Sequence, residues 1–347
     1  MVAVVTAVLV VVQATRNPPS ADSAQRAVPK LFVGVASCTF VDQTRPTVNF
    51  VTGVSAPGRR LVTEIRYPTI RPSVGVLETL DAGAYRRGAP YPLVVFAHGY
   101  DLTPQAYSKL LDSWVKAGFV VAAPIFPDTN PSTILAEGDA DTESDMDNQP
   151  ADVAFVIHEL LGANATGTGC AVVKGLLQPG KIALAGQSDG GDTVAALAFE
   201  SPYLDPSLHF RAVEVLSGAL MPPLRTTQKV VETGTAPLLV VQSATDRCNP
   251  PGASMQLYSS IAESDKWFVT LKRAPHLPPY TDVAPNADFG FVANETTKFL
   301  KDEFTGVAPN VDLHKIAAGA RALGYVTSGP PPALNPLTFV NSACFAS

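Results

Sequence analysis

The stretch that decides the fold is "KIALAGQSDGGDTVAALA", residues 181–198. Its beginning reads as a short buried strand and its end as a helix. Between them "GQSDG" (186–190) matches G-x-S-x-G, a pattern that holds a serine on a sharp strand-to-helix turn. The two glycines of the pattern would let the strand and the helix approach closely. This context favours a nucleophile at Ser188 over a serine in a solvated turn.

Apolar runs alternate with helical periodicity on both sides of this stretch. The run "PLVVFAHG" (92–99) is continuously apolar, as in a strand buried on both faces, whereas 61–68 alternates as an outer strand. Further strands are expected at 119–124, 181–187, 211–217, 237–243 and 267–272, and helices at 105–117, 150–161, 192–199, 253–262 and 288–304. Such alternation predicts an α/β fold with a doubly wound, mostly parallel sheet.

The chain is expected to contain one catalytic domain, residues 38–305, since no repeat or linker divides its middle. An apolar run that stops at Gln13 is too short for a comfortable transmembrane span, so residues 1–23 are interpreted as a signal peptide, with an uncleaved membrane anchor as the alternative. We expect a secreted or cell-envelope protein. The proline-rich segment 306–347 is predicted to be an extension packed on the domain.

The four cysteines permit up to two disulfides in an exported chain. Cys38 and Cys344 lie near the two ends of the domain, and we expect this pair to form a bridge. Cys170 and Cys248 are predicted to lie at opposite edges of the sheet and not to pair. No pair has C-x-x-C spacing, so neither a metal nor an organic cofactor is expected.

The charge pattern excludes one class of partner. A net charge of −6 with no basic run gives no footprint for nucleic acid. The acidic stretch 137–147 lacks the glycine of a calcium loop and is interpreted as a solvated loop. No stable membrane partner is expected unless the N-terminal segment is uncleaved.

A serine hydroxyl is a weak nucleophile, so Ser188 needs a base. His276 follows the strand 267–272 at the carboxyl end, where ligands gather in such sheets, and is the preferred base, with His314 as the alternative. The remaining histidines, which are interpreted as structural, are His98, His158 and His209.

The base in turn needs a carboxylate. Asp246 lies in the loop after the strand 237–243 and is preferred over Glu214, which is inside a strand. The order Ser188, Asp246, His276 is that of an α/β-hydrolase triad.

Acyl transfer also needs donors for the oxyanion, and the backbone amides of Tyr100 and Asp189 occupy the usual positions. The carboxylate of Asp189 is interpreted as a group favoured by the positive end of the following helix. Tyr100, Pro278 and Tyr280 are expected to line the substrate cleft. The short connection between the strands 211–217 and 237–243 predicts no large lid domain.

Over most of residues 60–304 the sequence resembles the α/β-hydrolase superfamily. The segments 92–124 and "LQPGKIALAGQSDGG" (177–191) are similar to the branch that contains chlorophyllases, dienelactone-hydrolase-like proteins and platelet-activating-factor acetylhydrolases. Polyester hydrolases and cutinase-like lipases have a similar core. The resemblance implies an ester substrate, although dienelactone hydrolases proper use cysteine where this chain has Ser188, and Asp189 also departs from the commoner residues after the serine.

The sequence therefore predicts a serine carboxylic-ester hydrolase that acts on small to bulky esters through an acyl-enzyme. A polyester hydrolase of the cutinase-like lipase type is the alternative within the same class. From another class, the alternative is a catalytically silent binding protein on a hydrolase fold.

Overall fold

The computed structural model describes residues 29–70, 78–138, 142–219, 224, 236–261, 265–282 and 287–306, and the backbone of 324–327. The described residues from Leu31 onward belong to one compact unit. The predicted signal peptide, His314 and most of the C-terminal extension lie outside the described residues. In the part of the chain that is described, no helix is long and apolar enough to cross a membrane.

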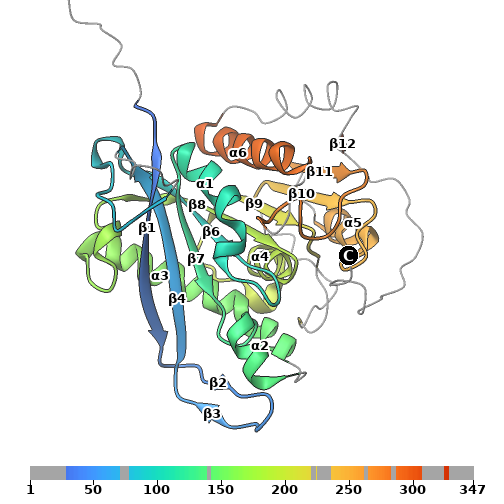
Figure 1. Cartoon of the computed structure of the whole chain (residues 1–347), viewed down its shortest axis with the longest axis horizontal. Coiled ribbons are helices and arrows are strands. Elements are labelled where there is room, and N and C mark those ends of the chain that lie inside the picture. The colour runs from blue at the N-terminus through green and yellow to red at the C-terminus, as the bar shows by residue number, and fades with distance from the viewer. Residues whose placement is uncertain are drawn as a thin grey trace, which may run out of the picture. The chain divides into compact units, whose positions relative to one another are not determined.

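The unit is built on a ten-stranded sheet in the order β12-β11-β10-β9-β8-β6-β7-β4-β1-β5 (Figure 1). Its strands are β1 (Phe32–Asp42), β4 (Arg59–Thr69), β5 (Glu78–Leu80), β6 (Tyr91–Ala97), β7 (Val120–Ile125), β8 (Leu177–Gln187), β9 (Phe210–Leu216), β10 (Leu238–Ser243), β11 (Lys266–Leu271) and β12 (Gly324–Thr327). A small hairpin pairs β2 (Thr47–Val48) with β3 (Ser55–Ala56).

The helices are α1 (Ser108–Lys116), α2 (Pro131–Glu137), α3 (Gln149–Thr166), α4 (Asp189–Phe199), α5 (Pro251–Ser260) and α6 (Phe289–Thr305). Short 3₁₀ turns are η1 (Arg86–Gly88), η2 (Pro104–Tyr107), η3 (Thr142–Asn148), η4 (Ala171–Val173) and η5 (Ser201–Tyr203). The elements expected from the sequence are all present with slightly shifted ends. The strands β1, β5 and β12, the helix α2 and the β2–β3 hairpin were not predicted from the sequence.

The sheet is doubly wound, as predicted. Strands β6 to β11 run parallel to one another, and β4 pairs antiparallel with β7 as the expected outer strand. One apolar cluster joins the sheet to α3, α4 and α5, and a second joins its other face to α1 and α6. Because apolar layers cover both faces, the central strands are rich in apolar residues. Since these strands are parallel, their carboxyl ends share one edge of the sheet.

The predicted Cys38–Cys344 bridge is wrong. Cys38, on β1, pairs with Cys170, just before η4, with 5.4 Å between their Cα atoms. This pairing also rules out a Cys170–Cys248 bridge, as expected. Position near the chain ends does not predict the pairing, because β1 is hydrogen-bonded to β4 and lies second from one edge of the sheet, where Cys38 meets the segment that precedes β8.

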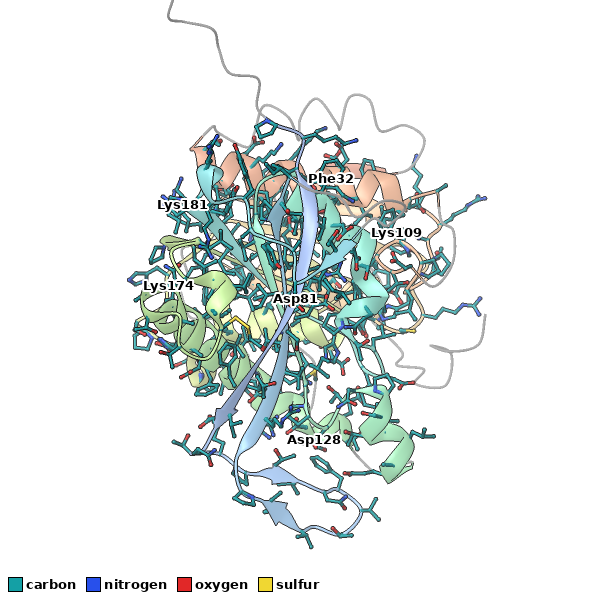
Figure 2. The ribbon with its side chains drawn as sticks, turned by 60° about the vertical axis from the view of Figure 1, so that its left-hand side comes forward. Phe32, Asp81, Lys109, Asp128, Lys174 and Lys181 are labelled. Carbon is teal, nitrogen blue, oxygen red and sulfur yellow. A yellow bond between two sulfur atoms is a disulfide. The ribbon has the colours of Figure 1, made fainter. Side chains whose placement is uncertain are left out.

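The acidic stretch is not the solvated loop that the sequence suggested. Asp145, on η3, is buried and accepts two hydrogen bonds from the buried Arg59 on β4. Asp152, on α3, accepts two more from the same guanidinium. Asp128, labelled in Figure 2, lies 3.6 Å from Arg59. The segment therefore folds onto the domain through a buried cation.

The absence of a large lid domain was predicted from the short connection between β9 and β10. Most of the connection between these strands is outside the described residues. Within the C-terminal extension, β12 pairs antiparallel with β11, so this part of the extension adds an edge strand to the sheet.

Candidate active site

Ser188 occupies the sharp turn between β8 and α4. Its φ of 56° and ψ of −127° are unusual for a residue with a side chain, and its N–H donates to the carbonyl of Leu216 at 2.9 Å. A Cβ at Gly186 would lie 2.0 Å from the carbonyl oxygen of Gly190, and one at Gly190 would lie 2.0 Å from that of Ala97. Glycine is therefore required at both motif positions for this close approach, as the sequence predicted.

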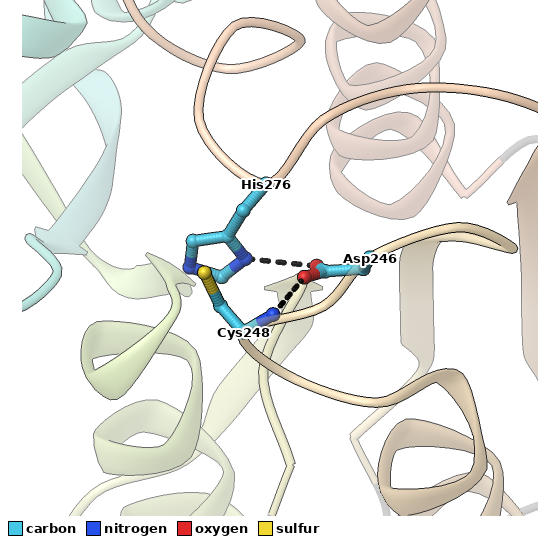
Figure 3. Close-up of side chains that lie close together, drawn as sticks. All are labelled: Asp246, Cys248 and His276. Carbon is cyan, nitrogen blue, oxygen red and sulfur yellow. Dashed lines mark hydrogen bonds and ion pairs between the residues drawn. The ribbon is translucent and has the colours of Figure 1, made fainter. Parts of the chain in front are cut away.

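The structure brings the three predicted side chains together at the carboxyl edge. His276 Nε2 lies 2.9 Å from Ser188 Oγ. Figure 3 shows the other contact, in which His276 Nδ1 lies 2.8 Å from Asp246 Oδ2. The three side chains come from loops after three different strands, β8, β10 and β11. Since Nδ1–H donates to the carboxylate, Nε2 is left to accept from the serine hydroxyl, which is the arrangement of a nucleophile, a base and an orienting acid.

Asp246 is held in place by its own loop. Its Oδ1 accepts from the backbone N–H groups of Cys248 at 2.9 Å and Asn249 at 3.1 Å, and its Oδ2 accepts from Gln242 Nε2 at 3.1 Å. The rival Glu214 is fully buried, and its carboxyl has no hydrogen-bond partner among the described residues. Burial raises the pKa of Glu214 well above its ordinary value. His276 is thus oriented by Asp246.

Two of the other histidines that the structure describes, His98 and His158, have other partners, and His209 is exposed. His98 is buried and accepts from the Phe126 N–H through Nε2, so that Nδ1–H donates to the Gly99 carbonyl. Burial lowers the pKa of His98 to about 4. His158 contacts Asp205 on the surface, 2.7 Å away.

Asp246, Cys248 and His276 offer ligand atoms within 4.8 Å of one another (Figure 3). The sulfur of Cys248 is itself in a disulfide bond, so it cannot serve as a thiolate ligand. The carboxylate already accepts hydrogen bonds from the protein. These contacts favour a role for Asp246 in orienting His276 over a role for the three residues as metal ligands.

That the amides of Tyr100 and Asp189 serve as oxyanion donors stays a prediction, and the structure describes the surroundings of both side chains. Tyr100 follows β6, and its hydroxyl contacts that of Thr142 at 2.9 Å. Asp189 begins α4 and is buried, and its Oδ2 has no hydrogen-bond partner among the described residues. Burial, with a smaller contribution from the charge of Glu143, raises the pKa of Asp189 to about 7. Its carboxyl is therefore partly protonated near neutral pH.

The prediction that Tyr280 lines the cleft is wrong. Tyr280 is fully buried, accepts from the hydroxyl of Ser217 at 2.9 Å and donates to the carbonyl of Val241 at 3.1 Å. A tyrosine in a proline-rich loop looks like a surface residue, but here the loop turns inward behind the histidine. Pro278 and Tyr100 are only partly buried.

Two residues beside the triad, Gln187 and Tyr107, were not predicted from the sequence. Gln187 Nε2 lies 3.3 Å from His276 Nε2, and Tyr107 donates to Gln187 Oε1 at 2.7 Å. Gln187 stands inside the serine motif and could have been noticed there. Tyr107 could not, because it fits the apolar periodicity of its helical segment.

Comparisons with known proteins show which family and which folds this chain is similar to. Residues 76–219 match the family model described as chlorophyllase. A solved structure described as ferulic acid esterase from Streptomyces cinnamoneus is similar with a TM-score of 0.59 and 17% sequence identity, over 79% of this chain and 91% of that chain. A search of curated proteins finds no match.

Proposed function

We propose that the chain is a serine esterase of the α/β-hydrolase family that hydrolyses carboxylic esters through a covalent acyl-enzyme. The observation that carries this proposal is the hydrogen-bonded series Ser188, His276 and Asp246. The chlorophyllase model matches the region that contains the serine turn, and the esterase neighbour shares the fold over 79% of this chain. Both similarities support an ester substrate.

In the first half reaction, Ser188 Oγ attacks the ester carbonyl carbon while His276 Nε2 takes the hydroxyl proton. Asp246 accepts a hydrogen bond from Nδ1–H and stabilises the imidazolium. The tetrahedral oxyanion is expected to accept hydrogen bonds from the amides of Tyr100 and Asp189. The intermediate then expels the alcohol, which takes the proton from Nε2.

In the second half reaction, a water molecule loses a proton to His276 and adds to the acyl carbonyl. The Ser188–acyl bond breaks, the proton returns to Ser188 Oγ, and the carboxylic acid leaves. These steps use only groups of the chain and water.

The cellular location of this reaction is proposed to be outside the cytoplasm. The Cys38–Cys170 disulfide is typical of proteins that fold in an oxidising compartment. An exported esterase would meet bulky or polymeric esters, so a polyester hydrolase remains the alternative in the same class.

Hydrolysis of p-nitrophenyl esters of increasing acyl length, together with an aromatic polyester film, tests the proposal. We expect Ser188→Ala and His276→Ala each to lower kcat by about a million-fold, and Asp246→Asn by about 10⁴-fold, because the three groups act as a unit. His158→Ala, at an exposed histidine outside the site, is the matched control and should keep full activity. A wild-type protein that binds such esters without hydrolysing them would instead be a silent binding protein.

A further inference from the structure

A buried chain of hydrogen bonds connects the loop after β6 with the histidine of the triad. The N–H of Gly99 donates to the hydroxyl of Tyr107 at 3.0 Å, and that hydroxyl donates to Gln187 Oε1 at 2.7 Å. At the other end of the amide, Gln187 Nε2 lies 3.3 Å from His276 Nε2 and 3.4 Å from the His276 carbonyl oxygen. Tyr107 and Gln187 are both fully buried.

The direction of each hydrogen bond follows from the donors available. A backbone N–H can only donate, so the oxygen of Tyr107 accepts from Gly99, and its own proton points to Gln187. Gln187 must therefore present its oxygen to Tyr107, which leaves its NH₂ group facing His276. Without the tyrosine hydroxyl, no hydrogen bond in this series would prevent the Gln187 amide from flipping, which would exchange the positions of its oxygen and its NH₂ group.

The same chain depends on close packing at Gly99. A Cβ at this position would lie 2.9 Å from Gln187 Oε1 and 3.1 Å from the Cβ of Ser188. The loop that leads to Tyr100 therefore rests directly on the turn that carries the nucleophile. A shift of Gln187 would therefore move both this loop and His276.

We propose that Tyr107 and Gln187 are positioning residues that fix His276 relative to Ser188 and to the loop at Gly99. The NH₂ group of Gln187 donates to the His276 carbonyl and lies against Nε2, whose lone pair accepts from Ser188. Tyr107 also accepts from the Gly99 N–H, but it reaches His276 only through Gln187. The inference rests on the proposed esterase function. Because the reacting atoms must be held to within a fraction of an ångström, loss of this support lowers the rate of the chemical step more than it weakens substrate binding.

Tyr107→Phe, Gln187→Met and the double variant test this arrangement in a double-mutant cycle. For a short p-nitrophenyl ester, we expect each single variant to lower kcat by about 10- to 100-fold, with KM changed less than about twofold. The double variant should be no slower than Gln187→Met alone, because Tyr107 affects His276 through the side-chain amide that Gln187→Met removes. Urea unfolding of each variant separates the kinetic effect from a loss of folded protein.

Tyr91→Phe is the matched control. Tyr91 is also buried and its hydroxyl also donates a hydrogen bond, here to the backbone carbonyl of Tyr85 at 2.7 Å, but it lies at the start of β6, away from the serine turn. It should leave kcat unchanged. If Gln187→Met does not fold, Gln187→Glu, which keeps the shape and lacks the NH₂ donor, takes its place in the cycle.

Effects of Tyr107→Phe and Gln187→Met that multiply in the double variant would overturn the proposal, and so would a kcat that neither variant changes. These outcomes leave the esterase function intact as long as the wild-type protein hydrolyses the ester and Ser188→Ala does not. A wild-type protein without Ser188-dependent hydrolysis contradicts the esterase function itself.

Discussion

Asp189, the residue after the nucleophile, links the stability of the fold to pH. The pKa of its buried carboxyl is raised to about 7, above the ordinary value of 3.8. Between these two values the folded protein keeps a proton that the unfolded chain has released. Raising the pH through this window therefore lowers the free energy of unfolding, and the loss is complete above the folded-state pKa.

Asp189→Asn should remove this dependence, because an amide does not titrate. We expect the free energy of unfolding of the variant, measured relative to the wild-type protein by urea denaturation, to increase from about pH 4 to about pH 8. A difference that stays constant over this range would mean that Asp189 does not hold the extra proton in the folded state.

Single residues were predictable where chemistry demands a particular side chain at a particular place. Ser188, His276 and Asp246 each follow a recognisable strand, and their order along the chain restricts the choice further. Tyr280 was misplaced because burial of a loop depends on what packs over it. Gln187 was missed because the sequence around it does not show that His276 lies beside it.

At the scale of the element, Arg59 fastens η3 and α3 to the strand β4. Its guanidinium is buried and donates to both Asp145 and Asp152. Arg59→Met would leave Asp145 buried without its cation and Asp152 with Arg45 alone, and we expect it to lower the free energy of unfolding by about 3–5 kcal/mol.

Arg60→Met is the matched control, since the adjacent Arg60 lies on the same strand but is exposed. It should change the free energy of unfolding by less than about 0.5 kcal/mol. Urea denaturation of both variants makes the comparison, and equal effects would show that the buried ion pairs contribute little to holding the segment.

The helices and central strands were predictable because their periodicity is local. Strand β1 was not, since "FVGVASCTFVD" mixes apolar residues with glycine, serine and threonine and lacks a continuous apolar run. Its place is set by pairing with β4, which is a property of the tertiary fold. The acidic stretch was misread for the same reason, because the cation that neutralises it comes from a distant strand.

At the scale of the whole molecule, the disulfide joins the first strand of the sheet to the segment before β8. Cys38 and Cys170 are 132 residues apart in sequence, whereas Ser188 lies at the opposite, carboxyl end of β8. A bridge that closes so long a loop restricts the unfolded chain strongly, and its removal should not disturb the catalytic groups.

We therefore expect the double variant Cys38→Ser, Cys170→Ser to lose about 2–5 kcal/mol of unfolding free energy while it keeps the kcat and KM of the wild-type protein under conditions where it is folded. Substitution is a sharper test than a reductant. Cys248, whose N–H supports Asp246, is also disulfide-bonded, so a reductant would act beside the active site as well. Urea denaturation and ester hydrolysis measured on the same samples separate the two effects. A variant that stays as stable as the wild-type protein would contradict the structural role of the bridge, and one that loses kcat while fully folded would show that the bridge supports the triad.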